Sequence, residues 1–133
     1  MHSFTVATRQ RCEFVDITDR VQTLVTKSAV AEGLCVVFVP HTTAAVTLNE
    51  HADPDVVRDM LADLAARVPH EGDYRHAEGN SDSHIKASLL GNSQMVPISR
   101  GHLTLGRWQG IFLCEFDGPR TRDVQVKLLA GIG

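Results

Sequence analysis

Hydrophobic and polar positions alternate along the first part of the chain and then change period. Apolar and polar side chains alternate in residues 3–7, and apolar side chains cluster in residues 14–17 after a polar turn. This pattern predicts two short strands joined by the turn. From about residue 18 the apolar positions recur at helical spacing. They are Val21, Leu24, Val25 and Ala29. We expect this helix to end at Gly33, because glycine readily adopts the left-handed conformation that terminates helices.

The next segment has the pattern of a central strand. Residues 34–39 are continuously apolar, so a strand buried on both faces is predicted. Pro40 cannot continue the hydrogen-bond ladder. His41 is therefore the first polar residue beyond the strand end. Residues 43–48 alternate again and predict a further strand, with Ala44, Val46 and Leu48 on one face.

Two further helices are indicated by their start and stop signals. Asp53 as N-cap and Pro54 at the first helical position begin one helix, and Pro69 marks its end. We expect its buried stripe to be Val57, Met60, Leu61 and Leu64. A second helix follows the polar decapeptide 75–84 and stops at Gly91.

The remainder predicts strands. Residues 95–98 contain Pro97 and suggest an edge strand, and further strands are expected near 102–105, 111–116 and 124–128. The order of elements predicts a single α+β domain over residues 1–133. Its expected architecture is a mixed, mostly antiparallel sheet with about three helices.

Composition narrows the class of protein. Hydrophobic residues make up 43% and charged residues 22%, an ordinary profile for a soluble domain. The formal net charge of −3 argues against nucleic-acid binding. The N-terminus has no apolar signal-peptide region, and no run is long enough to span a bilayer. The three cysteines lie in apolar stretches, as expected of buried thiols in a reducing compartment. We therefore expect a cytoplasmic protein.

The polar decapeptide 75–84 is the strongest candidate for chemistry. Asn80 or Ser81 can cap the helix that follows, and His84 falls in its first turn. Helix N-termini bind anions through their unpaired N–H groups. The competing interpretation is a solvated connector with an ordinary cap.

Other polar residues at element ends are weaker candidates. His41 can bind a ligand, or it can form a hydrogen bond with a nearby carbonyl. Asn49 can be a turn residue. Glu50 has no evident packing role. Glu115 interrupts an apolar strand, so it points either to solvent or to a buried partner. Arg120 and Arg122 can pair with it or hold a phosphate by bidentate bonds.

Trp108 and a set of histidine and carboxylate side chains are further candidates for the site. The structural interpretation of Trp108 is a core anchor whose indole N–H is satisfied by a carbonyl. His76 and His84, with Glu78 or Asp82, offer imidazole and carboxylate ligands for a metal, although no HExxH or CxxC motif is present.

Several polar motifs together resemble the YjbQ family, also called UPF0047. They are Pro40-His41-Thr42-Thr43-Ala44-Ala45, Asn49-Glu50 with Ala52-Asp53-Pro54, Glu78-Gly79-Asn80-Ser81-Asp82-Ser83-His84-Ile85-Lys86, Gly106-Arg107-Trp108-Gln109-Gly110 and Asp117-Gly118-Pro119-Arg120. The motifs agree in order, and the resemblance covers practically the whole chain. Two positions depart from the family pattern: His51 stands where Asn is usual, and Arg107 where a small residue precedes the Trp-Gln pair.

The resemblance implies a compact α+β fold that assembles as a homotrimer. It also implies a secondary thiamine-phosphate synthase activity, which joins a hydroxymethylpyrimidine diphosphate to a thiazole phosphate and releases pyrophosphate. On this basis we expect catalytic roles for His41, Glu50 and His84. Substrate binding is expected from Asn49, Asn80, Ser81, Trp108, Gln109 and Arg120. A divalent metal ion, Mg²⁺ or Zn²⁺, is expected to be bound by His41, His76 and His84.

Two hypotheses from different classes follow. The first is an enzyme that acts on a phosphorylated small molecule with histidine or glutamate acid/base groups and a divalent ion. The second is a non-catalytic trimer that binds a phosphorylated or anionic metabolite. The density of titratable groups favours the enzyme, whereas the absence of an aspartate-rich magnesium motif favours the binding protein.

Overall fold

The computed structural model describes residues 1–131. Three helices and eight strands are found in this range. The helices are α1 (Thr18–Ser28), α2 (Pro54–Arg67) and α3 (Ser81–Leu90). The strands are β1 (His2–Ala7), β2 (Glu13–Asp16), β3 (Gly33–Phe38), β4 (Ala44–Glu50), β5 (Ser93–Ser99), β6 (His102–Leu103), β7 (Gln109–Glu115) and β8 (Thr121–Ala130).

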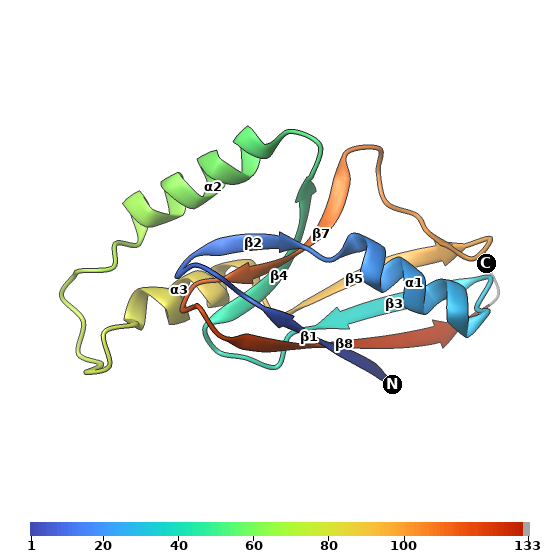
Figure 1. Cartoon of the computed structure of the whole chain (residues 1–133), viewed down its shortest axis with the longest axis horizontal. Coiled ribbons are helices and arrows are strands. Elements are labelled where there is room, and N and C mark those ends of the chain that lie inside the picture. The colour runs from blue at the N-terminus through green and yellow to red at the C-terminus, as the bar shows by residue number, and fades with distance from the viewer. Residues whose placement is uncertain (132–133) are drawn as a thin grey trace.

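The strands form two antiparallel sheets, which confirms the predicted α+β class (Figure 1). Sheet A has five strands in the order β1-β8-β3-β5-β6, and sheet B has three in the order β2-β7-β4. Every strand pairing among residues 1–131 is antiparallel. The first two strands do not pair with each other: β1 joins β8 in sheet A, and β2 joins β7 in sheet B.

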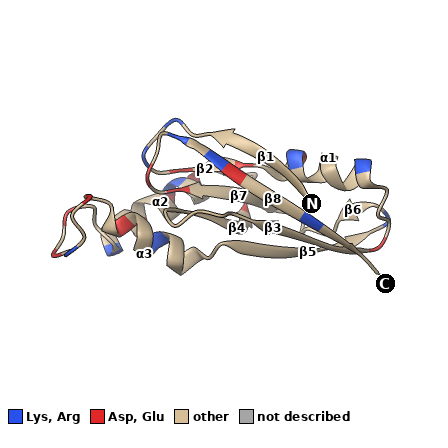
Figure 2. Cartoon of the chain, turned by 90° about the horizontal axis from the view of Figure 1, so that it is seen from below, with Lys and Arg blue, Asp and Glu red and all other residues tan. Residues whose placement is uncertain are grey.

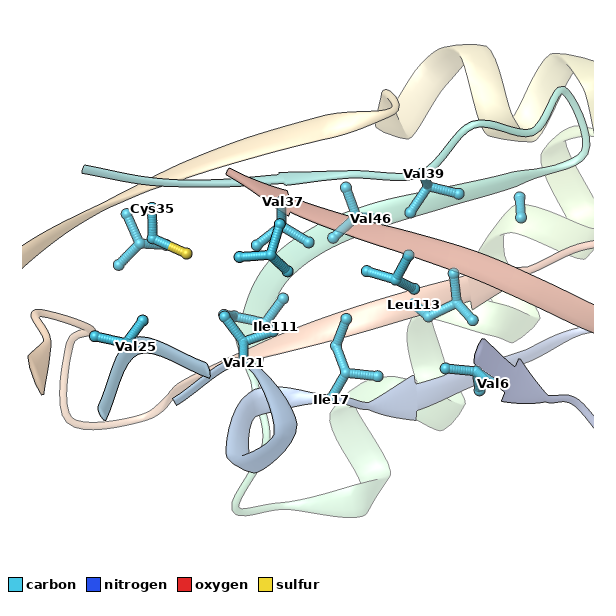
Figure 3. Packing of buried hydrophobic residues seen from close by; sticks show 14 of the residues in the cluster. Val6, Ile17, Val21, Val25, Cys35, Val37, Val39, Val46, Ile111 and Leu113 are labelled. Atoms are coloured by element: carbon cyan, nitrogen blue, oxygen red, sulfur yellow. The ribbon is translucent and has the colours of Figure 1, made fainter. Parts of the chain in front are cut away.

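The main core fills the space between the two sheets and beneath α1. Val37 comes from sheet A, Val46 and Leu113 from sheet B, and Val21 from α1, and all are buried (Figure 3). The predicted face of β4 is confirmed, because Ala44, Val46 and Leu48 all belong to this cluster. Alternation along each strand thus sends one set of side chains into the common core.

A second, smaller core lies on the other face of sheet B. Its buried members are Ala45, Ala87, Phe112, Cys114 and Phe116. They come from β4, α3 and the β7 segment, so α3 is anchored against the outer face of sheet B. This packing fixes the position of the α3 N-terminus.

The prediction that residues 34–39 are buried on both faces was wrong. Cys35 and Val37 are fully buried, but Leu34 is 37% and Phe38 41% exposed. Sheet A therefore has one face on the core and an outer face that the described residues leave open. Figure 2 shows that β3 and β5 carry no charged residues, which explains why the segment looked fully buried in the sequence.

Two helix predictions need correction. Helix α1 ends at Ser28, where Ala29 takes a left-handed conformation (φ 59°), and not at Gly33. Gly33 is required for another reason: a Cβ there would lie 1.9 Å from the carbonyl oxygen of Leu129 on the neighbouring strand.

Helix α2 begins as predicted, with the Asp53 side chain accepting a hydrogen bond from the Asp55 N–H (2.9 Å). Its apolar stripe is not buried, because no residue of α2 falls in the buried class. The stripe is only partly covered by sheet B.

Strand β5 lies beside the short terminal strand of sheet A. It pairs with β3 along its length, and with β6 only at Ile98 and Ser99. Pro97 therefore lies close to the sheet edge, in keeping with its missing N–H donor. No helix among residues 1–131 has the length and apolar content needed to cross a membrane.

Candidate functional site

The polar decapeptide forms part of a pocket at the start of α3. The pocket has a volume of about 550 Å³. Its lining residues are Asp73, Tyr74, Arg75, His76, Ser81, His84 and Ile85. The rings of His76 and His84 meet edge to face with centroids 5.5 Å apart, and Nε2 of His76 lies 3.6 Å from the Glu78 carboxylate. Of the three histidines predicted to converge, these two are brought together.

The loop before α3 folds on itself and thereby places Arg75 and His76. Its residues are about 68–80, and two internal contacts hold it. The Tyr74 hydroxyl donates to the carbonyl of Pro69 (2.6 Å), and the His70 ring bonds the carbonyl of Gly79 (2.9 Å). Gly79 has a φ of 77°, a conformation that favours glycine at this turn. The loop is therefore an organised wall of the pocket.

Asn80 connects the start of α3 to Arg120. Its carbonyl accepts hydrogen bonds from the N–H groups of Ser83 and His84. Its side chain does not cap the helix, contrary to one expectation, but donates from Nδ2 to Oδ2 of Asp117 (2.8 Å). Arg120 donates to the same oxygen (3.2 Å). Oδ1 of Asn80 is buried and has no partner among residues 1–131, so this acceptor can take a donor from a ligand.

Asp82, one of the two carboxylates considered as a metal ligand, is a structural anchor. It is fully buried and accepts hydrogen bonds from both Nη atoms of Arg11 (2.9 and 3.1 Å) and from Nζ of Lys86 (3.0 Å). Burial alone raises the pKa of Asp82, but these hydrogen bonds and charges outweigh it and lower the pKa. The contact with Lys86 could have been inferred from the i,i+4 spacing. Arg11 is too distant in sequence to be found this way.

Glu115 has a buried partner, which is one of the two alternatives the sequence left open. Arg122 donates from Nε at 2.9 and 3.1 Å and also from Nη2, and Thr8 donates from its hydroxyl (2.7 Å). Burial raises the pKa of Glu115, but the hydrogen bonds from Arg122, the Asp117 N–H and Thr8 lower it further than burial raises it. The pair connects the end of β7 to the start of β8.

His41 lies against this buried pair and does not line the α3 pocket. Its Nε2 accepts a hydrogen bond from the backbone N–H of Asp123 (2.8 Å), which assigns the proton of the neutral ring to Nδ1. Burial lowers the pKa of His41, and the positive charge of Arg122 lowers it further. The neutral ring is therefore favoured in the folded protein.

The predicted metal ligands are His41, His76 and His84, and the structure places His41 apart from the other two. Among residues 1–131, no group of three or more His, Cys, Asp or Glu side chains is placed to hold a metal ion. His76 and His84 offer two imidazoles, but His41 is engaged elsewhere. A three-histidine ligand set is thus not assembled within the described part of one chain, and a divalent metal stays a prediction.

Four of the predicted site residues lie at the opposite end of sheet B. In the pairing of β4 with β7, Ala44 lies opposite Glu115, whereas Asn49 and Glu50 lie opposite Gly110 and Gln109. At about 3.4 Å per residue, Glu50 is roughly 20 Å along the strand from the end that carries the α3 pocket. The four residues at the far end are Asn49, Glu50, Trp108 and Gln109.

The interpretation of Trp108 as a core anchor is wrong. The side chain is 54% exposed, and the Arg107 guanidinium lies over its ring at 4.8 Å from the centroid. Gln109 has a local structural contact, since its Oε1 accepts from the Gly106 N–H (2.8 Å). Trp108 ends the loop before β7, and Gln109 is the first residue of β7.

The fold and the pocket define an α+β domain of two antiparallel sheets with a histidine-bearing pocket at a helix start. The family model described as "UPF0047 protein YjbQ-like" matches residues 2–131, so the chain belongs to the YjbQ family. It is 46% identical to a UPF0047 protein of Methanocaldococcus jannaschii over 129 residues, covering 97% of this chain and 94% of the relative. It is 44% identical to the UPF0047 protein YugU of Bacillus subtilis, covering 97% and 98%.

Solved structures show the same fold. A YjbQ/UPF0047 family protein of Clostridium acetobutylicum superposes with a TM-score of 0.96 at 52% identity, covering 97% of this chain and 100% of that one. A conserved protein of Thermus thermophilus superposes with a TM-score of 0.91 at 43% identity, covering 97% and 100%. The two-sheet architecture is therefore that of the family.

Proposed function

We propose that the pocket at the start of α3 binds the phosphate group of a small-molecule substrate. One observation carries this proposal: the pocket joins a helix N-terminus to Arg75, His76 and His84. Helix N–H groups and the dipole favour a negative charge at this position. Arginine and protonated histidine add charge-assisted hydrogen bonds.

The reaction we propose is of the secondary thiamine-phosphate synthase type, which the family resemblance implies. A hydroxymethylpyrimidine diphosphate would be joined to a thiazole phosphate, with release of pyrophosphate. Negative charge grows on the departing pyrophosphate as its bond to carbon breaks. Donors already aimed at that charge lower the barrier, and such preorganised donors usually dominate catalysis of this kind.

The chain's own residues have separate parts in this proposal. Arg75 and the first N–H groups of α3 bind the diphosphate, and His84, in contact with His76, donates a proton to it or hydrogen-bonds it. Arg120 is held beside Asn80 through Asp117 and adds positive charge near the helix start. Glu50 lies outside this pocket, so its predicted catalytic role is not part of the proposal. No step is assigned to a metal ion.

The second candidate is a binding protein for a phosphorylated or anionic metabolite, without turnover. The sequence has no aspartate-rich magnesium motif, which favours the binding protein, because pyrophosphate transfer commonly relies on a divalent ion. We also propose a homo-oligomer, a trimer by family resemblance. It is supported by the open face of sheet A, where Leu34, Phe38, Met95 and Leu129 are each at least 37% exposed.

An assay with both substrates, with and without Mg²⁺ or Zn²⁺, distinguishes the two candidates. The enzyme forms thiamine phosphate, and His84→Ala reduces turnover by about a hundredfold or more while the melting temperature is kept. The matched control is His102→Ala, which changes an exposed histidine outside the pocket. Full activity in His84→Ala contradicts the proposed site, and ligand binding without turnover under any condition supports the binding protein.

A further inference from the structure

A second cavity system lies between α2 and the outer face of sheet B. One cavity of about 230 Å³ and one of about 280 Å³ share Phe14 as a lining residue. Neither shares a residue with the α3 pocket. Helix α2 covers this groove with Val57 and Leu64, which pack against the smaller core, yet none of its residues is buried. The groove is therefore roofed by a helix that is only loosely packed.

The floor of the groove is aromatic. Phe14 of β2 and Phe112 of β7 lie with ring centroids 6.0 Å apart at an interplanar angle of 45°. Both line the smaller cavity. Aromatic faces attract cations and pack well against other rings.

The charged residues that line the two cavities are all acidic. They are Asp16, Glu50, Asp53 and Asp63, and no lysine or arginine is among the lining residues. Three of these have defined partners: Asp53 caps α2, Asp63 pairs with Arg67 (2.6 Å), and Asp16 pairs with His51. Among residues 1–131, Glu50 accepts only the N–H of Ala52 (2.8 Å), so one of its carboxylate oxygens remains for a ligand.

His51 presents a fixed hydrogen-bond acceptor to the same cavity. Its Nδ1 bonds the Asp16 carboxylate (2.9 Å), and Asp16 is held in turn by the hydroxyl and N–H of Thr18. The ring packs against Gly110, where a Cβ would lie 2.4 Å from Nδ1. A carboxylate partner places the proton of the neutral ring on Nδ1, which leaves Nε2 as an acceptor.

We propose that this groove is a second ligand site, for a small aromatic ammonium compound. The aromatic ring of the ligand lies over Phe14 and Phe112 beneath α2. Its ammonium group donates to the Glu50 carboxylate and to Nε2 of His51. The proposal is independent of the function assigned to the α3 pocket, because the two sites share no lining residue.

The test is a titration of the ¹⁵N-labelled full chain with benzylamine, which is cationic at neutral pH, followed by amide chemical shifts. Benzyl alcohol is the neutral analogue and benzoate the anionic one. Benzylamine is expected to shift the amides of Phe14, His51, Val57 and Phe112, and to bind at least tenfold more tightly than benzyl alcohol. Benzoate is expected not to shift them.

Matched variants distinguish a specific role of Glu50 from the general effect of removing one negative charge. Glu50→Gln is expected to weaken benzylamine binding at least fivefold. Glu71→Gln, which makes the same change at an exposed loop position, leaves binding unchanged. His51→Asn provides a second test if Glu50→Gln is poorly folded.

Three outcomes overturn the proposal. If benzylamine and benzyl alcohol bind with equal affinity, the ammonium group does not contribute to binding. If Glu50→Gln and Glu71→Gln have equal effects, Glu50 is not part of the binding site. Concentration-dependent changes at the same amides without any ligand show that a second copy of the chain occupies the groove.

Discussion

The buried pair of Glu115 and Arg122 is the clearest case in which a single residue decides stability. Arg122 is 2% exposed and Glu115 fully buried. Arg122→Met leaves the carboxylate buried without its partner, and we expect the free energy of unfolding to fall by about 3–5 kcal/mol. Chemical denaturation measures this change.

Arg120 is the matched control, because it is half exposed in its pair with Asp117. Arg120→Met is expected to cost about 0–1 kcal/mol. Adding Glu115→Gln to Arg122→Met is expected to restore part of the lost stability, because no buried charge then lacks a partner. A loss below about 1 kcal/mol in Arg122→Met would show that the pair is not structural.

His41 is expected to make stability depend on pH. Its pKa in the folded protein is lowered by burial and by Arg122, whereas in the unfolded chain it has its ordinary value of about 6.5. As the pH falls through that value, the unfolded state binds a proton that the folded state does not, so the free energy of unfolding decreases. In His41→Gln this contribution disappears.

Denaturation midpoints between about pH 7.5 and 5 test this expectation, since the interval brackets the ordinary histidine pKa. The wild-type protein should lose more stability over the interval than His41→Gln does. Gln can still accept the hydrogen bond from the Asp123 N–H, so the comparison isolates the effect of protonating His41 on stability. Parallel pH profiles for the two proteins would refute the assignment.

Among single residues, the sequence located the polar side chains better than it identified their partners. His76 and His84 were expected together and lie together, because they flank one short loop. Arg122 was a candidate partner of Glu115 from the sequence, because the two residues lie close together in the chain. Arg11 was not expected to pair with Asp82, because the two residues meet only in the folded chain. Such long-range contacts leave no local pattern in one sequence.

Helix α2 is the element expected to open most readily. It contributes no buried residue, so its amide hydrogens are expected to exchange faster than those of β7, where six consecutive residues from Gly110 to Glu115 are buried. Asp53→Ala removes the N-cap and costs about 1 kcal/mol, which raises exchange in α2 roughly fivefold. Exchange in β7 should not change.

Asp59→Ala serves as the control for this prediction, since Asp59 is exposed within α2 and has no cap role. It should leave α2 exchange unchanged or slow it, because alanine favours helix. Uniform protection of α2 and β7 would show that the helix is packed more firmly than its exposure indicates.

Element boundaries were predicted well where a residue type forces them. Asp53-Pro54 began α2 and Gly91 ended α3 as expected. The end of α1 was misplaced because Ala29, a residue without special turn preference, takes the left-handed position. Burial of α2 was overestimated, since an apolar stripe shows which face turns inward and not how closely it packs.

For the whole molecule, the open face of sheet A leads to a prediction about assembly. Phe38 and Met95 are 41% and 59% exposed on neighbouring strands without charged residues. If this face joins copies of the chain, Met95→Lys introduces an unpaired charge into the interface and favours the monomer. Light scattering at micromolar concentration measures the change in mass.

Glu71→Lys, at an exposed loop position, is the control and should keep the wild-type mass. A wild-type monomer, or an unchanged oligomer in Met95→Lys, contradicts the proposal that this sheet face joins copies of the chain.

The α+β class followed from the pattern of elements. The division into two sheets did not, because it depends on β1 and β2 pairing with strands near the other end of the chain.

The most direct measurement of the proposed phosphate site is calorimetric titration with pyrophosphate, using the wild-type protein, His84→Ala and Glu50→Gln. The α3 pocket predicts binding that His84→Ala weakens at least tenfold. Glu50→Gln should leave it unchanged, because Glu50 lies at the far end of sheet B. Undiminished pyrophosphate binding in His84→Ala, or an equal loss in Glu50→Gln, would contradict a phosphate site at the start of α3.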